Sequence, residues 1–382
     1  MKTKKHGALI AILLIATVML GAAAAGLSLP TRRELSGRRH VAALEKAYEQ
    51  GGQEAYLKAL GQLTDQALLD VVLEAAKSYE AGGAQFFSLG QIATQRIAPL
   101  VDPALLEQFL LDPELPESFK TFMLEVTLYV HGTDGDHADK VKRILKEEQL
   151  SENLTVYLIV SVDWDMDSLP ILRDIYESSS SVRLQGLALR TIAVVDKAGT
   201  KNELYHMVEH YQDYDEALLH DGVIALVSVG RLGEPPYQDA PQVLLTLCQK
   251  LLTEQHTVTA NHINSILNLT GGVMSETNTK GLFRLLYEYQ DKVPNLHHVL
   301  TYVDEMIYPE IDEMLLSDNE EEARFALEAA SLYPMDYYNE NLQTMARRHP
   351  ALSEQATKLI DFTKEHTLPN SKTKTQQGGS SS

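Results

Sequence analysis

The sequence predicts an all-α protein, and three observations lead to that class. Between residues 40 and 366, apolar residues recur every three or four positions, which is the period of a helix with one buried face. Alternation of apolar and polar residues, the mark of a half-buried strand, is nearly absent. Several periodic segments, such as HVAALEKAYEQGG, end in glycine, as helices commonly do at their C-terminus.

The first thirty residues form a separate targeting element. A basic stretch with Lys2, Lys4 and Lys5 precedes twenty uncharged residues, 8–27. This apolar stretch is long enough to cross the roughly 30 Å core of a bilayer. We expect it to be a retained single-pass anchor that precedes a body outside the cytoplasm. The alternative is a signal peptide that is cleaved in the small-residue run 22–25, which would leave the body secreted.

Length and composition set limits on the body. A chain of 382 residues is long for one compact core, so we expect two domains or one extended array. Fifty-three acidic residues against 33 basic ones give a formal charge of -20, and such a surface repels nucleic acid. The single cysteine, Cys248, excludes an intramolecular disulfide, and its apolar context LLTLCQKLL predicts a buried thiol.

A longer period is superimposed on the helical one. An apolar helix end, a short polar turn and another apolar helix recur from FLLDPELPESFKTFMLEVTLYVHG near residue 110 to MLLSDNEEEARFALEAASLYP near residue 314. The steps between these segments are about 28 to 40 residues, the size of paired-helix repeats. We therefore expect antiparallel helix pairs that bury a face by stacking on their neighbours. The apolar run 154–164 is expected to be a buried helix within this array.

Two segments share an apolar-Arg pair followed by small residues. They contain Val182, Arg183, Gly186 and Ala188, and Ala323, Arg324, Ala326, Ala329 and Ala330. In this pattern, over about residues 100–345, the chain resembles the HEAT-repeat family. The resemblance implies a right-handed α-solenoid of antiparallel helix pairs that holds another macromolecule.

The expected organisation has five parts. They are the anchor or signal peptide 1–30, a helical linker and N-terminal cap 31–100, HEAT-like repeats 101–345, a capping helix 346–366 and a disordered tail 367–382. The tail is expected to be disordered because no large apolar residue follows Leu368.

One segment is a candidate for catalysis. His206, Glu209 and His210 have the H-x-x-E-H order of one class of zinc peptidases. Two histidines one helical turn apart can reach one zinc ion, and the glutamate would serve as the base. The third ligand in those enzymes is a glutamate roughly 70 to 80 residues further on. Glu288 lies 78 residues after His210, and Glu276 lies 66 after it. The alternative function is therefore a metal-dependent hydrolase with His206, His210 and Glu288 as ligands.

A non-catalytic interpretation of the same segment is favoured. Apolar residues of the segment share one helix face, so His206 and His210 point away from it and, with Tyr205 and Glu209, form a candidate binding face. The chain has 17 tyrosines against 8 phenylalanines, and segments that mix tyrosine with acid suit a protein or a basic peptide as partner. We expect a scaffold at the cell envelope, with no cofactor, no catalytic residues and no bound metal.

Two acidic loops have some features of ion sites. Asp163, Asp165 and Asp167 alternate as at the start of an EF-hand loop, but the positions that need glycine and a bidentate glutamate hold other residues. We expect a turn in which Asp167 or Ser168 caps the next helix. The loop in 131–140, with two glycines, is likewise expected to be an ordinary connection between helices.

Overall fold

The computed structural model describes residues 32–80, 90–148, 150–230, 235–271, 276–301 and 308–366, and every regular element in these ranges is helical. The all-α class is thereby confirmed. The expected anchor, 8–27, and the expected tail, 367–382, lie outside the described residues. Among the helices of the described part, none is long and apolar enough to span a bilayer. The chain divides into two compact units, one ending at Asp163 and the other beginning at Trp164.

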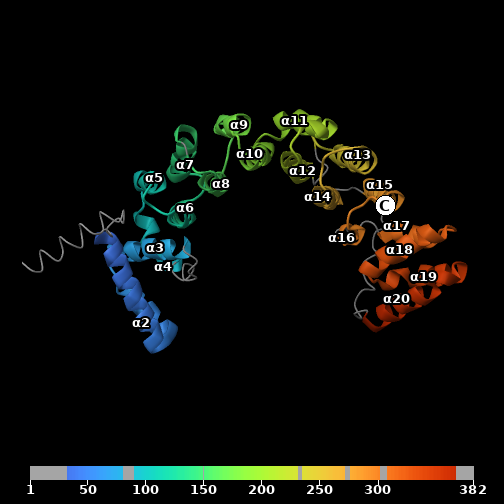
Figure 1. The fold of residues 1–382 in the computed structure, drawn as a ribbon, viewed down its shortest axis with the longest axis horizontal. Coiled ribbons are helices and arrows are strands. Elements are labelled where there is room, and N and C mark those ends of the chain that lie inside the picture. Colours follow the sequence, from blue (N-terminus) through green and yellow to red (C-terminus); the bar gives the residue numbers. More distant parts are fainter. Residues whose placement is uncertain are drawn as a thin grey trace, which may run out of the picture. The chain divides into compact units, whose positions relative to one another are not determined.

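Unit 1 is built from helices that pack in two rows. Its elements are α2 (Arg32–Gly61), α3 (Asp65–Glu80), α4 (Gly90–Arg96), η2 (Ala98–Leu100), α5 (Pro103–Leu111), α6 (Glu117–His131), α7 (Asp136–Glu147) and α8 (Glu152–Ser161). Helix α5 packs on α6 and α7, while α6 packs on α8, on α4 and on η2 (Figure 1). Helices α5 and α7 therefore form one row, and η2, α6 and α8 form the other.

Local sequence signals explain several helix boundaries in unit 1. Asp102 caps α5 by accepting a hydrogen bond from Leu105 N, and Pro103 follows as the first helical residue. Ser151 caps α8 in the same way. The glycine pair that the sequence marks as a helix end interrupts α2, because Gly52 takes a left-handed φ of 64° that a residue with a Cβ rarely adopts.

Residues 154–161 of the apolar run belong to helix α8, as expected, whereas residues 162–164 follow the helix, and α8 is buried on one face only. Leu154, Leu158 and Ile159 of α8 are buried, whereas Tyr157 and Val160 are exposed. The expected helix is confirmed, and its burial is limited to one face, which the sequence did not indicate because a run with few polar residues carries no period to show which face is covered.

Unit 2 continues the alternation of helices over a longer stretch. Its elements are α9 (Leu169–Ser178), α10 (Val182–Val195), α11 (Lys197–Glu209), η3 (Tyr211–Asp213), α12 (Glu216–Gly230), α13 (Ala240–Thr253), α14 (Ala260–Gly271), α15 (Glu276–Glu288), α16 (Leu296–Leu300), α17 (Tyr308–Leu315), α18 (Glu320–Leu332), η5 (Asp336–Tyr338), α19 (Asn339–Arg348), η6 (Pro350–Leu352) and α20 (Ser353–His366).

These helices pack as pairs and as rows. Each of the pairs α9 with α10, α11 with α12, α13 with α14, α17 with α18 and α19 with α20 is in contact. Figure 1 shows α11, α13 and α15 following one another in one row, and α10, α12, α14 and α16 in the other, and the same helices are in contact along each row. The architecture is thus repeat-like, and the core lies between the two rows, where Met207, Leu226 and Leu244 are buried.

Small residues allow close helix contact where the sequence pattern places them. Gly186 is buried in α10 against α12, and a Cβ there would lie 1.9 Å from Asp221 Oδ2 and 2.8 Å from Asp221 Cβ. The two arginines of the pattern differ in position, however. Arg183 is the second residue of α10, whereas Arg324 follows a full first turn of α18 and pairs with Glu320.

Polar contacts join successive helix pairs at close to one repeat's separation in the chain. In unit 1, Lys140 Nζ lies 2.8 Å from Glu107 Oε2, 33 residues earlier. In unit 2, Arg173 Nη1 lies 2.6 Å from Glu203 Oε2, 30 residues later. Equivalent positions of neighbouring pairs therefore meet, and we call these contacts the stacking contacts.

Candidate functional site

The segment HMVEH closes helix α11 at its C-terminal end. Asp196 begins the helix by accepting a hydrogen bond from Gly199 N, and His210 N–H donates to His206 O at its end. Leu204, Met207 and Val208 are buried, so the residues between them face outward by helical geometry.

The two histidines and the glutamate between them are exposed. The ring centroids of His206 and His210 lie 4.3 Å apart, with the planes tilted by 49°. The rings therefore sit together on the outer side of the helix end, where water can reach both of them.

The structure does not bring the suggested third ligand to this pair. Helix α13 packs on α11 on one side and on α15 on the other, so Glu288, the last residue of α15, lies two helix pairs further along the row. A spacing of 78 residues corresponds to about two repeats. Because successive repeats stack side by side, residues two repeats apart in sequence lie two helix pairs apart in space. Within the described ranges, no group of three His, Cys, Asp or Glu side chains is arranged to hold a metal ion.

Tyr205 differs from the other three residues of the candidate binding face because it is engaged within the protein. Its hydroxyl donates to Asp239 Oδ1 at 2.6 Å, and Lys201 Nζ lies 4.8 Å from its ring centroid. Burial, together with the hydrogen bond to the Asp239 carboxylate, raises the pKa of Tyr205. The hydrogen bond from Tyr205 in turn lowers the pKa of Asp239. Tyr205 is therefore a stacking contact between α11 and the start of α13, and the exposed face consists of His206, Glu209 and His210.

An open polar pocket of about 210 Å³ lies beside this face. It is lined by Glu209, His210, Tyr211, Gln212, Asp213, Lys250 and Glu254. Lys250 Nζ donates to Glu209 O at 3.2 Å, and Tyr211 Oη donates to Glu254 Oε2 at 3.3 Å. These groups already bond to one another across α11 and α13, so the pocket walls also serve as stacking contacts.

The acidic loop at 163–168 is a turn, but its capping differs from the expectation. Ser168 stands at the N-cap of α9, yet its hydroxyl donates to Asp165 Oδ1 at 2.6 Å and does not cap the helix. Asp163 Oδ2 accepts from Thr133 Oγ1 at 2.7 Å. The hydroxyl of Ser168 binds Asp165 because that carboxylate also accepts from Ser168 N and closes the turn locally.

In the loop of 131–140, the histidines bind the preceding repeat. His137 is buried, and its Nε2 lies 2.8 Å from Val101 O. His131 Nε2 lies 3.0 Å from Ala98 O, and the two imidazoles stack with centroids 4.2 Å apart. Asp134 and Asp136 are exposed. The loop thus connects α6 with α7, and the histidines of these two helices form hydrogen bonds with backbone carbonyl oxygens.

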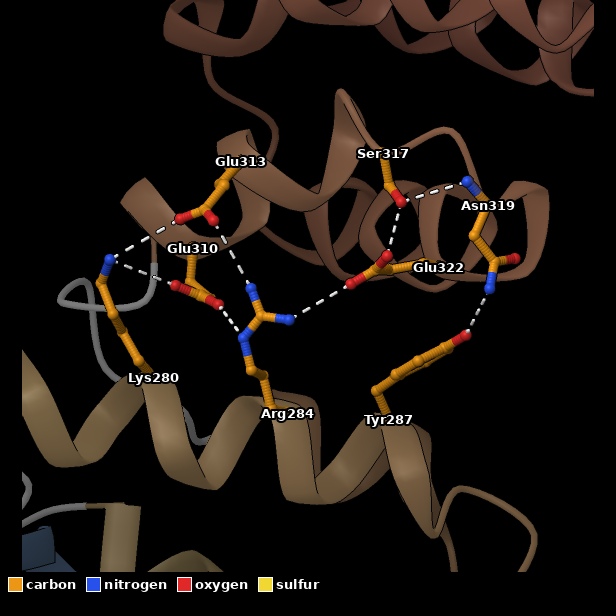
Figure 2. Close-up of polar contacts among 8 residues, drawn as sticks. All are labelled: Lys280, Arg284, Tyr287, Glu310, Glu313, Ser317, Asn319 and Glu322. Atoms are coloured by element: carbon orange, nitrogen blue, oxygen red, sulfur yellow. Dashed lines mark hydrogen bonds and ion pairs between the residues drawn. The ribbon is translucent and has the colours of Figure 1, made fainter.

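A charged cluster that the sequence did not reveal joins α15, α17 and α18 (Figure 2). Glu310, whose side chain is only 1% exposed, lies 2.8 Å from Arg284 Nε and 3.4 Å from Lys280 Nζ. Arg284 Nη1 also lies 3.3 Å from Glu322 Oε1, and Glu313 lies within reach of both bases. The ion pairs of Glu310 are contacts between opposite charges without hydrogen bonds, because neither of its carboxylate oxygens accepts a hydrogen bond of good geometry from the described residues.

This cluster joins helices of the protein to one another. A buried carboxylate persists only when opposite charges offset its lost hydration, and Lys280 and Arg284 provide them. The segment YPEIDEML offered no signal for it, because one glutamate among three acids looks like a solvated residue. The separations of 30 residues from Lys280 to Glu310 and 38 from Arg284 to Glu322 identify its members as stacking contacts.

Cys248 behaves as the sequence indicated. It is fully buried in α13, and its Sγ donates to Thr270 Oγ1 of α14 at 3.4 Å. Burial raises the pKa of the thiol to about 12, so the thiol is protonated and unreactive at neutral pH.

Comparison of the chain with protein-family models, with curated proteins and with solved structures finds no match.

Proposed function

We propose that this protein is a non-catalytic binding or scaffold protein whose helix pairs form a HEAT-like right-handed solenoid. The observation that carries the proposal is the stacking of helix pairs in two rows within each unit, joined by contacts one repeat apart. Each pair in such proteins contacts mainly its neighbours, so the outer residues of many pairs combine into one extended surface. The usual use of that surface is to hold another macromolecule.

The proposal includes a location at the cell envelope. Residues 8–27 would anchor the chain in the membrane, with the helical body on the side away from the cytoplasm, and secretion after cleavage is the alternative. The excess of acidic residues favours a basic protein or peptide as the partner. Extraction of membranes with alkaline carbonate, followed by the mass of the mature N-terminus, distinguishes an anchored chain from a cleaved one.

The binding function is tested by photo-crosslinking of the full-length chain in its own cells. A photoreactive residue is placed at one exposed position at a time in each row, and a crosslink to one discrete protein from neighbouring positions is the expected result. Buried Leu226 is the control position, and it should give no crosslink to another protein.

The hydrolase alternative is tested by metal analysis of the purified full-length chain. We expect no stoichiometric zinc and the same melting temperature with and without a chelator. His297→Ala is the matched control for His206→Ala, because His297 is another exposed histidine. Stoichiometric zinc that is lost in His206→Ala and kept in His297→Ala would overturn the non-catalytic assignment.

A further inference from the structure

Five large apolar side chains are exposed in one row of unit 1, and we call them the apolar strip. They are Leu100 of η2, Tyr129 and Val130 of α6, and Tyr157 and Val160 of α8. Tyr129 is 83% exposed, Leu100 62% and Val160 60%, so these side chains contribute almost nothing to the core. Apolar side chains that cluster on a surface in this way mark contact sites for other molecules.

Two hydrogen bonds place the elements that carry the apolar strip next to one another. His131 Nε2 lies 3.0 Å from Ala98 O, which joins the end of α6 to η2. Asp163 N donates to Thr133 O at 2.9 Å, which joins the residues after α6 to those after α8. Leu100, Val130 and Val160 each lie within three residues of one of these contacts. The C-terminal ends of the three elements are therefore side by side, and each element carries exposed apolar side chains.

The apolar strip is a property of these ends and not of every helix in such a row. In unit 2, the residues one repeat further along, Val194 near the end of α10 and Ser228 near the end of α12, are also exposed. The α12 position is polar, and α10 offers Val194 without an exposed aromatic neighbour. Of these described helix ends, those of unit 1 therefore carry two exposed tyrosines and three exposed aliphatic side chains, and tyrosine is a favoured residue at protein interfaces.

Acidic residues follow the members of the apolar strip closely in the chain. The exposed acids Asp102, Asp134 and Asp163 each follow a strip residue by two to four positions. The C-terminal ends of α6 and α8 add the negative end of the helix dipole. Arg96, the basic residue that precedes Leu100, is already paired with Asp65. Glu125 lies one turn before Tyr129 in α6 and is exposed as well.

We propose that the apolar strip is the docking site for a basic, amphipathic segment of a partner protein. Its apolar side chains would cover Tyr129, Tyr157 and Val160, and its lysines and arginines would lie beside the neighbouring acids. Three elements spaced roughly 8–10 Å apart cover about 20 Å, which is the length of about 13 helical residues. This inference rests on the proposed binding function and names the partner chemistry and the surface.

The test measures binding of a defined peptide to the full-length chain in phosphatidylcholine nanodiscs. The probe is a fluorescein-labelled helical peptide of leucine and lysine, about 18 residues long, and its counterpart carries glutamate in place of lysine. We expect the lysine peptide to bind more tightly, and its binding to weaken when NaCl rises from about 0.05 to about 0.5 M.

The double variant Tyr129→Ser/Val160→Ser should raise the Kd for the lysine peptide by about tenfold or more. The matched control is Val194→Ser/Tyr337→Ser, which removes one exposed valine and one exposed tyrosine from unit 2. The control should leave the Kd unchanged. Equal melting temperatures for both double variants show that a lost peptide contact, and not unfolding, causes the change.

Three results with the purified chain would overturn the inference. They are an equal loss of binding in both double variants, equal binding of the lysine and glutamate peptides, and self-association of the chain that the strip variant abolishes. The last result would make the apolar strip an interface between two copies. If crosslinks to a partner arise only around His206 and His210, the docking inference fails while the proposed binding function stands. Zinc-dependent hydrolysis would overturn the proposed function itself.

Discussion

The two units differ in which side chains they expose to water and which they bury. Unit 1 leaves Tyr129, Tyr157 and Val160 in contact with water, whereas unit 2 takes the carboxylate of Glu310 out of water and surrounds it with Lys280 and Arg284 (Figure 2). Exposed apolar area has a free-energy cost that a partner can remove, while the charge of Glu310 is offset within the protein by two bases. The difference teaches that binding capacity and internal cohesion are separate properties of one architecture.

Removal of Arg284 should have the largest effect on stability. Arg284→Met leaves Glu310 buried with Lys280 alone, and we expect the free energy of unfolding to fall by about 3 kcal/mol. Urea denaturation followed by circular dichroism measures this loss. Lys358→Met, which removes an exposed pair with Glu354, is the control and should change the value by less than about 0.5 kcal/mol. Equal effects of the two variants would show that the cluster around Glu310 contributes no more than a surface pair.

Replacing glycine by alanine should have opposite effects on stability at a tightly packed position and at an open one. Gly186→Ala in unit 2 forces a Cβ against the base of Asp221, which cannot move without the helix, and should cost about 1–3 kcal/mol. Gly61→Ala, at the end of α2 in unit 1, meets no atom within 4 Å and should stabilise by up to about 1 kcal/mol. Thermal unfolding of both variants checks the signs, and a stable Gly186→Ala protein would mean that α10 and α12 pack less closely than described.

Acidification should weaken unit 2 through His220. Its Nε2 lies 2.6 Å from Ser265 Oγ, and its ring centroid lies 5.4 Å from that of His262. Burial, and then the neighbouring His262, lower the pKa of His220. The unfolded chain, where histidine titrates near about 6.5, therefore binds the proton more readily than the folded one. Stability from this residue is fully present above the unfolded pKa of about 6.5, and it is lost as the pH falls below that value towards and through the lowered pKa of the folded state.

The measurement for His220 is the free energy of unfolding at about pH 7.5 and about pH 5.5. The unmodified chain should lose more stability between these two values than His220→Gln does, because glutamine carries no titrating proton. A larger loss in the variant would contradict the assigned direction of the pKa shift.

The smallest stability effect is expected in the apolar strip. Because Tyr129 and Val160 project into water, Tyr129→Ser/Val160→Ser should change the free energy of unfolding by less than about 0.5 kcal/mol. The same urea titration used for Arg284→Met gives the value. A loss of several kcal/mol would show that these side chains belong to the core of unit 1, and the contrast between the units would disappear.

Structural features that depend on nearby residues could be predicted from the sequence. The helical period indicated the all-α class, the glycine pair marked the interruption of α2, and the apolar context of Cys248 indicated a buried thiol. The outward direction of His206 and His210 follows from the apolar residues around them. Each of these inferences depends on residues within one or two turns of each other.

Features that depend on neighbouring pairs could not be read in this way. The hydroxyl of Tyr205 is engaged by Asp239, 34 residues away, and the carboxylate of Glu310 is buried by bases from α15. The exposure of Tyr157 and Val160 depends on what stacks against α8, since its sequence is apolar all round. Which of many acids, tyrosines or valines meets a given neighbour is decided by the stacking register, and a single sequence does not state that register.

The stacking contacts have a mechanical consequence. Because a contact such as Lys140 with Glu107 or Arg173 with Glu203 bridges adjacent pairs, a pulling force along a row would load few bonds at any moment. Within each unit, the helices would therefore separate pair by pair from the end and reseat in the reverse order. Each unit would then lengthen and shorten reversibly under tension, as a spring does and a rigid strut does not.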